Sequence, residues 1–399
     1  MIQSRTRRVA GTAVALVAGL ALGSAAVAET SEFQMPRLMV IGAAGTSGGS
    51  FASTNGWAPI LQKDVGSMVR VVPEDNEAQR YRRLVERGDF RFVSVSSAEV
   101  RFQTLGIGGY VSTSPAAQRI LWHHNDTPWG FVVAGDSPIQ SMEDLKERGG
   151  RISVAIQSPP MVTAVKKALP AYLGLSEDEV SEKFRYISAG SYGESCRSVV
   201  EGRADVAYCT PTSSVLSEME GAPGGIRWLP MDMSNTEGWE RFLDHRPMTV
   251  PAKMELGVSS GRGVEGLISN FLYVLPADAD EEYAYNMAKW FHEKYDLYKN
   301  THILASRMAL ENFRDYLNRS PLPVHDGTIR YLREIGQWTD EDDAWNQEAI
   351  EKMDRWVAAR KAAMEEARAK RVEIDHENEA FMAILSRHTE GLEDFRSRL

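Results

Sequence analysis

The sequence predicts an α/β protein with two lobes. Short apolar strands alternate with helical segments, a pattern typical of mixed or mostly parallel sheets. The alternation occurs in two blocks of similar size, and a stretch containing Pro and Gly near residues 123–130 separates them. Of the 399 residues, 43% are hydrophobic and 25% are charged. That composition is typical of a soluble globular chain and excludes a polytopic membrane protein.

The first block begins with an apolar run at residues 37–41, which has strand character. A Gly-rich loop follows at 42–50, and the next segment has helical character. In order, we predict a helix at 51–63, a strand at 68–72, a helix at 77–87 closed by Gly88, and a strand at 90–95.

The second block repeats the same alternation. In order, we predict strands at 129–134, 151–156, 184–187 and 205–209, and helices at 141–148, 161–173 and 192–201. Residues 276–318 have apolar and aromatic side chains at helical spacing, and Pro321 and Pro323 end that region. The stretches near 123–130 and 247–263 are candidate crossings between the lobes, where a hinge would lie.

The N-terminus has the pattern of a secretory signal peptide. Arg5, Arg7 and Arg8 precede an uncharged run, and Ala26-Val27-Ala28 forms a small-residue cleavage site. We therefore expect residues 1–28 to be removed after Ala28 and the mature chain to be periplasmic. Arg7-Arg8 leaves the choice between general secretion and twin-arginine export open. No later stretch is apolar enough to span a bilayer.

Net charge excludes broad nucleic-acid binding. The whole chain has 45 basic and 55 acidic residues, a net charge of −10. Loss of the three arginines in residues 1–28 leaves 42 basic and 55 acidic residues, a net charge of −13. Non-specific binding of nucleic acid needs a basic face.

Residues 337–399 differ from the rest of the chain. Of these 63 residues, 26 are charged, and apolar residues recur among them at helical spacing. We expect a helical C-terminal extension. One interpretation is an arm that covers the surface of a lobe, and the other is a helix that docks a partner or a second copy of the chain.

The loop at residues 42–50 is a candidate anion site. A strand leads into it and a helix follows, so free backbone N–H groups and the positive end of a helix dipole would face the ligand. Gly42, Gly45 and Gly48 also approach a dinucleotide fingerprint, in which Glu74 or Asp75 would hold the ribose. The loop alone leaves cofactor, phosphate and carboxylate open.

Other Ser and Thr residues follow predicted strands. Ser96 and Ser97 follow a strand in the first block, whereas Ser158 and Thr210 follow strands in the second. Ligands of open α/β sheets bind outside the carboxyl ends of strands, so these loops fit a ligand between two lobes. The alternative is ordinary N-capping of the next helices.

Arg80 is a candidate partner for an anionic ligand, because a guanidinium group can grip a carboxylate in two places. The alternative is a solvated helix arginine beside Arg82 and Arg83. The sequence has no zinc-ligand spacing such as H-E-x-x-H, and we predict no catalytic residue and no metal ligand.

Cys196 and Cys209 are the only cysteines in the sequence. An exported chain meets an oxidising environment. Cys196 falls in a predicted helix and Cys209 ends the next strand, so both lie at one edge of the sheet. A disulfide and two buried free thiols remain the two alternatives.

Several motifs, in this order, resemble the TAXI class of solute-binding subunits from TRAP-type transporters. The resemblance covers about residues 37–336. The matching segments are Ile41–Phe51, Asp89–Ser97, Ile139–Lys146, Gly150–Val154, Gly202–Ala207 and Pro323–Gly327 with Tyr331 and Glu334–Gly336.

The resemblance implies a type II periplasmic-binding fold with a cleft between two lobes. Lobe 1 would comprise residues 37–127 and 255–325, and lobe 2 residues 128–250. A small carboxylate, glutamate-like or a dicarboxylate, would bind in the cleft and pass to a membrane permease, with no cofactor and no catalysis. By position, the expected ligand-binding residues are Thr46, Ser47, Gly48, Ser50, Phe51, Arg80, Ser96, Ser97, Ser158 and Thr210.

This sequence departs from the family pattern at three places. Phe51 stands where Tyr is common, Pro159-Pro160 replaces a loop of small residues, and Arg80 stands where Asn is frequent. An additional carboxylate or a ligand of different size would fit such changes. Two other functions remain: an exported α/β enzyme with a dinucleotide cofactor, and a solute sensor that signals through the C-terminal extension.

Overall fold

The computed structural model describes residues 33–398. The predicted signal peptide, residues 1–28, lies outside the described residues. Within the part that the structure describes, no helix is both long and apolar enough to cross a bilayer. Residues from Met35 onward form one compact unit.

The strands are β1 (Leu38–Ala43), β2 (Met68–Pro73), β3 (Phe92–Ser96), β4 (Gln118–Ala134), β5 (Gly150–Ala155), β6 (Phe184–Ala189), β7 (Ala207–Cys209), β8 (Ile226–Leu229), β9 (Thr249–Lys253) and β10 (Glu265–Pro276). The strands up to β7 follow the predicted alternation, whereas β8, β9 and β10 were not predicted.

The helices lie between the strands and beyond them. They are α1 (Gly49–Val65), α2 (Glu77–Val85), α3 (Ser97–Leu105), α4 (Met142–Arg148), α5 (Pro159–Thr163), α6 (Leu169–Leu173), α7 (Glu177–Lys183), α8 (Tyr192–Arg197), α9 (Ser214–Glu220), α10 (Thr236–His245), α11 (Glu281–Glu293), α12 (Tyr295–Tyr298), α13 (Leu310–Leu317), α14 (Asp326–Glu334), α15 (Asp340–Ala369) and α16 (Glu379–Thr389).

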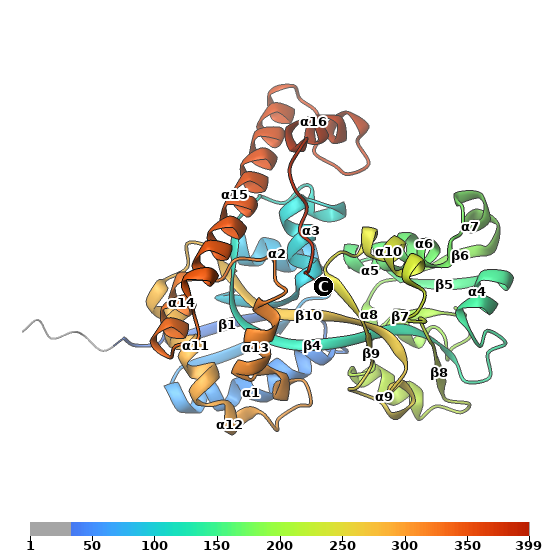
Figure 1. Ribbon diagram of the computed structural model, residues 1–399, viewed down its shortest axis with the longest axis horizontal. Helices are drawn as coiled ribbons and strands as arrows, with labels where there is room; N and C mark the ends of the chain where they lie inside the picture. Colours follow the sequence, from blue (N-terminus) through green and yellow to red (C-terminus); the bar gives the residue numbers. More distant parts are fainter. Residues whose placement is uncertain (1–32, 399) are drawn as a thin grey trace, which may run out of the picture. The chain divides into compact units, whose positions relative to one another are not determined.

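The fold is a two-lobed, mixed α/β fold. Lobe 1 contains β1, β2 and β3, which pair in parallel, and β10 joins them antiparallel to β3. Lobe 2 contains β5, β6, β7 and β8. The lobes appear in Figure 1 as the blue and orange part and the green part.

Two long strands run from one lobe into the other. The first part of β4 pairs antiparallel with β10, from Gln118 opposite Pro276 to Trp129 opposite Leu267. The last part of β4 pairs with β7 and β8, from Gly130 to Ala134. The expectation of a separate strand beginning at Trp129 is therefore wrong, because the stretch at 123–130 lies inside the continuous strand β4.

Each lobe has buried apolar side chains around its part of the sheet. In lobe 1, Trp57 of α1 packs edge-on against Tyr273 of β10 and Phe291 of α11. In lobe 2, Phe131 of β4 and Tyr208 of β7 belong to a separate cluster with residues of α5 and α6. Packing of these buried aromatic rings holds the strands of each lobe in place, and with them the loops that follow the strands.

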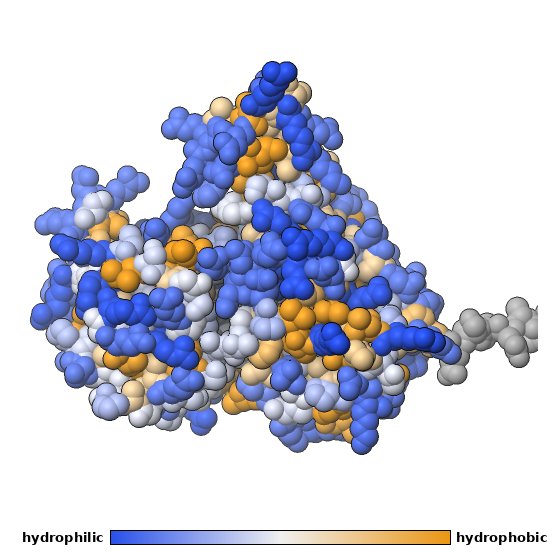
Figure 2. Space-filling model, turned by 180° about the vertical axis from the view of Figure 1, so that it is seen from behind, coloured by the Kyte–Doolittle hydropathy of each residue, from blue (hydrophilic) through white to orange (hydrophobic). Residues whose placement is uncertain are grey.

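The C-terminal arm, residues 337–398, packs on lobe 1 through a buried arginine. Arg360 of α15 is 1% exposed and donates hydrogen bonds to the carbonyl oxygens of Gln103, Tyr110 and Thr113 at 2.6, 2.8 and 3.2 Å. Gly106 makes this approach possible, because a Cβ there would lie 2.4 Å from Arg360 Nε. Figure 2 shows mainly hydrophilic residues over the arm, with a small hydrophobic area near its tip.

The end of the arm returns to the region where the lobes meet. Asp394 pairs with Arg101 of α3 in lobe 1, with Nη2 and Oδ2 2.5 Å apart. Ser397 N–H donates to the carbonyl oxygen of Pro247, which follows α10 of lobe 2, at 2.9 Å. Phe395 between them is fully buried. The arm thus contacts both lobes of its own chain.

We predict that Arg360→Met lowers the free energy of unfolding by about 3 kcal/mol, because it leaves buried carbonyl oxygens without their charged donor. Urea unfolding of the mature protein measures this. The matched control is Lys361→Met on the exposed side of the same helix, which should change the value by less than about 0.5 kcal/mol. Equal values for the two variants would contradict the anchoring role of Arg360.

Candidate functional site

A cavity of about 80 Å³ lies between the two lobes. A buried water needs roughly 10–15 Å³ by the same measure, so the cavity has room for several waters or one small solute. Its walls come from the loops after β1, β3, β5 and β7 and from the middle of β4 and β10. The residues that line it are Ala44, Gly45, Gly48, Gly49, Ser50, Asp75, Glu77, Arg80, Ser96, Glu99, Thr127, Trp129, Ala155, Gln157, Ser158, Pro160, Met161, Tyr192, Tyr208, Thr210, Thr212, Arg246, Ser269 and Phe271.

The start of α1 forms one wall of the cavity. Gly48 precedes the helix and has no side chain to cap it, and within residues 33–398 no acceptor bonds the backbone N–H groups of Gly49, Ser50 or Phe51. Gly48 and Ser50 line the cavity. The first turn of α1 therefore presents free N–H groups and the positive end of the helix dipole at this wall.

Four of the expected ligand-binding residues do not line the cavity. Thr46 is exposed, and Phe51 is half-buried outside the lining. Ser47 instead lies against α8 of lobe 2, where a Cβ on Gly193 would come within 2.5 Å of Ser47 Oγ. Ser97 is fully buried, and its hydroxyl donates to the carbonyl oxygen of Met248. Ser47 and Ser97 thus contribute to contacts around the cavity.

Gly48, Ser50, Arg80, Ser96, Ser158 and Thr210 do line the cavity. Two of these residues cap the N-terminus of a helix, which is the alternative role that the sequence also allows. Ser96 Oγ accepts from Glu99 N–H at the start of α3, and Ser158 Oγ accepts from Met161 N–H at the start of α5. Thr210 shares a hydrogen bond with Thr212 at 2.9 Å.

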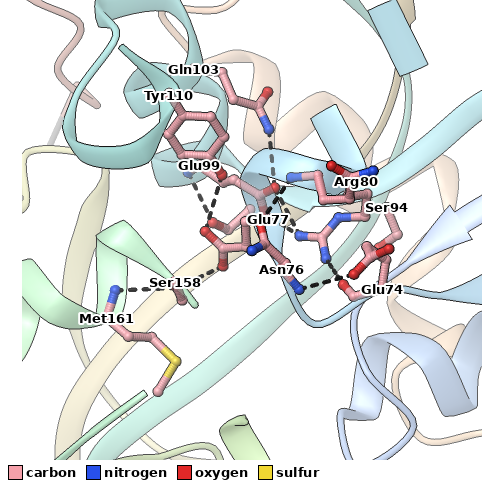
Figure 3. A network of polar contacts seen from close by, with 12 residues as sticks. Glu74, Asn76, Glu77, Arg80, Ser94, Glu99, Gln103, Tyr110, Ser158 and Met161 are labelled. Atoms are coloured by element: carbon pink, nitrogen blue, oxygen red, sulfur yellow. Dashed lines mark hydrogen bonds and ion pairs between the residues drawn. The ribbon is translucent and has the colours of Figure 1, made fainter. Parts of the chain in front are cut away.

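Arg80 is held by a carboxylate of the protein itself, as Figure 3 shows. Its Nη2 lies 2.8 and 2.7 Å from the two carboxylate oxygens of Glu99, and Nη1 donates to the carbonyl oxygen of Glu74 at 2.5 Å. Arg80 is 2% exposed, so the alternative of a solvated helix arginine is wrong. Burial raises the pKa of Glu99, and the charge of Arg80 opposes that rise.

Hydrogen bonds connect the lobes beside this ion pair. Glu77 of α2 accepts from the Ser158 hydroxyl of lobe 2 at 2.6 Å and from the Tyr110 hydroxyl at 3.1 Å (Figure 3). Asn76 Nδ2 donates to Gln157 Oε1 of lobe 2 at 2.6 Å. The side of the cavity beside α2 is therefore closed by polar contacts between the lobes.

Five lining residues have buried polar atoms with no hydrogen-bond partner among the described residues. They are Arg80 Nε, Trp129 Nε1, Tyr208 Oη, Arg246 Nε and Ser269 Oγ. A buried polar atom without a partner is unfavourable by about 1–3 kcal/mol, and a bound solute can supply the missing partner. Burial raises the pKa of Tyr208 to about 12, so its hydroxyl stays protonated and can donate.

Sequence reasoning missed several of these residues. Trp129 and Tyr208 lie in predicted strands, but nothing in the sequence distinguishes them from core aromatics. Arg246 follows α10 far from any motif, and its Nη1 donates to the carbonyl oxygen of Pro160, which also lines the cavity, at 2.6 Å. The sequence suggests Asp75 only as a ribose partner, although its position after β2 is a signal for this edge of the sheet.

Cys196 and Cys209 are joined by a disulfide, with Cα atoms 6.1 Å apart. This spacing is within the usual range for disulfides. The bond fixes α8 to the end of β7, directly before Thr210 and Thr212 of the cavity wall.

The chain belongs to the NMT1-like family, whose model matches residues 41–336. A search of curated proteins finds no match. The chain is also similar to solved structures of low identity. A periplasmic transporter has 9% identity and a TM-score of 0.47, with 79% of this chain and 96% of that chain covered.

Two binding proteins are among the other similar structures. The alkanesulfonate-binding protein of Xanthomonas axonopodis pv. citri, solved with MOPS, has 13% identity and a TM-score of 0.40, with 84% of this chain and 94% of that chain covered. An ancestral arginine-binding protein, solved with arginine, has 13% identity and a TM-score of 0.39, with 69% and 99% covered.

We predict that the double substitution Cys196→Ala and Cys209→Ala lowers the free energy of unfolding by about 3 kcal/mol, the value expected for a loop of this length. Chemical unfolding of the oxidised protein and the variant measures it. A reducing agent should destabilise the parent protein by a similar amount and leave the variant unchanged. A parent protein insensitive to reduction would contradict a disulfide that stabilises this wall.

Proposed function

We propose that the protein is an extracytoplasmic solute receptor, which binds a small carboxylate between its lobes and delivers it to a TRAP-type membrane permease. The observation that carries the binding proposal is the cavity between the lobes, where free N–H groups of α1 and buried donors lack partners. A carboxylate group accepts hydrogen bonds from such donors. The permease partner follows from the resemblance of the sequence motifs to TAXI subunits.

The binding cycle uses the two strands that the lobes share. Lobe 1 comprises residues 37–127 and 255–325, lobe 2 comprises residues 128–250, and the crossings in β4 and before β10 act as the hinge. Closure brings donors of β4, such as Trp129, and of the segment at Arg246 against the start of α1. The ligand selects the closed form because it bonds to both lobes only in that form.

The contacts between Asn76 and Gln157 and between Glu77 and Ser158 also belong to the closed form. These hydrogen bonds stabilise the closed form, and their formation requires no group of either lobe to gain or lose a proton. The permease then recognises the closed surface, and opening releases the solute. The signal-peptide pattern supports the periplasm as the location of this cycle.

The dinucleotide alternative has less support. The cavity of about 80 Å³ has room for several waters or one small solute, which is less than a dinucleotide needs. The Asp75 carboxylate also lies over the Gly-rich loop at residues 42–50, since a Cβ on Gly45 would be 2.0 Å from Asp75 Oδ1. The space that a pyrophosphate would need above the glycines is therefore occupied. The sensor alternative keeps the same ligand site and differs in the role of the C-terminal arm, which would then also contact a partner or a second copy.

We predict that Trp129→Phe weakens binding of the preferred small carboxylate at least tenfold, because it removes a buried N–H donor and keeps the aromatic ring. A thermal-shift screen of the mature protein against small carboxylates, phosphate and NAD identifies the ligand. Calorimetric titration then compares the variants.

The matched control is Trp228→Phe. Trp228 Nε1 donates to Ser260 Oγ, and neither residue lines the cavity, so this variant should bind as the parent protein does. Stabilisation by NAD alone would contradict the receptor proposal. Equal affinity of the Trp129 variant and the parent would contradict a ligand held between the lobes.

A further inference from the structure

The cavity walls carry more acidic than basic side chains. The titratable residues with full charges that line it are the acids Asp75, Glu77 and Glu99 and the bases Arg80 and Arg246. With all of them ionised, the lining has a net charge of −1. Arg80 and Glu99 neutralise each other at 2.7 Å, so Arg80 cannot serve as the main counter-ion of a ligand carboxylate.

The remaining two acids lack an ion-pair partner among the described residues. Glu77 accepts hydrogen bonds only from the hydroxyl groups of Ser158 and Tyr110. Asp75 is exposed at the rim of the cavity, and no hydrogen bond or ion pair involves its side chain within the described chain. Burial raises the pKa of both carboxyl groups, although the charge of Arg80 opposes the rise.

Donor groups gather elsewhere on the same lining. Trp129 Nε1 and Arg246 Nε have no acceptor among the described residues, and their side chains are 9% and 4% exposed. The free N–H groups at the start of α1 add to them. The cavity therefore offers donors for one acceptor group of a solute and two carboxyl groups for a cationic group.

We infer that the solute carries a cationic nitrogen, which faces Asp75 and Glu77, and no more than one anionic group, which accepts from Trp129, Arg246 and α1. This inference rests on the proposed function and narrows it. A dicarboxylate would bring two negative charges to a lining that has three carboxyl groups and only two guanidinium groups, and like charges in an enclosed site repel strongly. A neutral zwitterion or a cation leaves the site closer to neutrality.

The test uses pairs of ligands that differ in one charge. Calorimetric titration of the mature protein compares glutamine with glutamate, which adds a carboxylate, and each amino acid of the panel with its counterpart that lacks the amino group. Arginine and alanine complete the panel. We expect the best amino acid to be neutral or cationic, and to bind at least tenfold more tightly than its counterpart without the amino group.

The variant Asp75→Asn reports on the cationic end. This substitution should weaken binding of the best amino acid about tenfold. Binding of the counterpart without an amino group should stay unchanged or become tighter, so that the ratio of the two affinities falls. The matched control is Glu74→Gln, which changes the net charge equally one residue away, with a side chain outside the cavity lining. This control should keep the parent preference.

The outcomes separate the two proposals. Tight binding of a dicarboxylate or of an acid without an amino group would overturn the charge inference and keep the receptor. Equal losses for both ligands of a pair in Asp75→Asn would also overturn it, because they would indicate a general distortion. Failure of every member of the panel to bind the parent protein at millimolar concentration would overturn the receptor proposal together with the inference.

Discussion

The antiparallel pairing of β4 with β10 is the interaction on which the rest of the structure depends. β4 extends from lobe 1 into lobe 2, where its last residues pair with β7 and β8. β4 is one continuous strand, so its pairing with β10 in lobe 1 also fixes the orientation of β7 and β8 in lobe 2. The loops at the strand ends then meet around one cavity, to which β4 and β10 themselves contribute Trp129 and Ser269.

The polar groups of that cavity explain why a solute would be held there. Most buried polar groups in proteins have partners, and unpaired ones need an explanation. Here several unpaired donors surround one space, beside a helix start that no side chain caps. The glycine at position 45 leaves room for the Asp75 carboxylate over the loop at residues 42–50, so this acidic group, like Glu77, lies in the same lining as the unpaired donors. A small solute with complementary groups would satisfy both.

Much of the fold could be predicted from the sequence, because apolar periodicity and glycines mark the elements locally. The helix predicted at 77–87 corresponds to α2, and the strand at 151–156 corresponds to β5. Pro128 and Gly130 misled the prediction for β4. Both are typical breakers, yet Pro128 lies within the strand opposite Ile268, because pairing over many residues outweighs one unfavourable position.

The residues of the site that could be predicted from the sequence lie mostly in or beside loops after strands. Loops at the ends of strands are visible in the sequence, so Gly48, Ser50, Ser96, Ser158 and Thr210 could be placed near the cavity. Partners that come from distant elements are not visible. Glu99 neutralises Arg80 from a different helix, and Arg246 arrives from the end of α10. These contacts depend on tertiary packing, which one sequence does not record, and they change the expected charge of the ligand.

The most direct test of a solute bound between the lobes is amide hydrogen exchange of the mature protein, with and without its tightest small ligand. The account predicts slower exchange at the first-turn amides of α1, Gly49 to Phe51, and at residues 157–163 of lobe 2 at the same ligand concentration. Slower exchange in one lobe alone, or only around Trp345 and Arg355 in the groove beside α15, would contradict it.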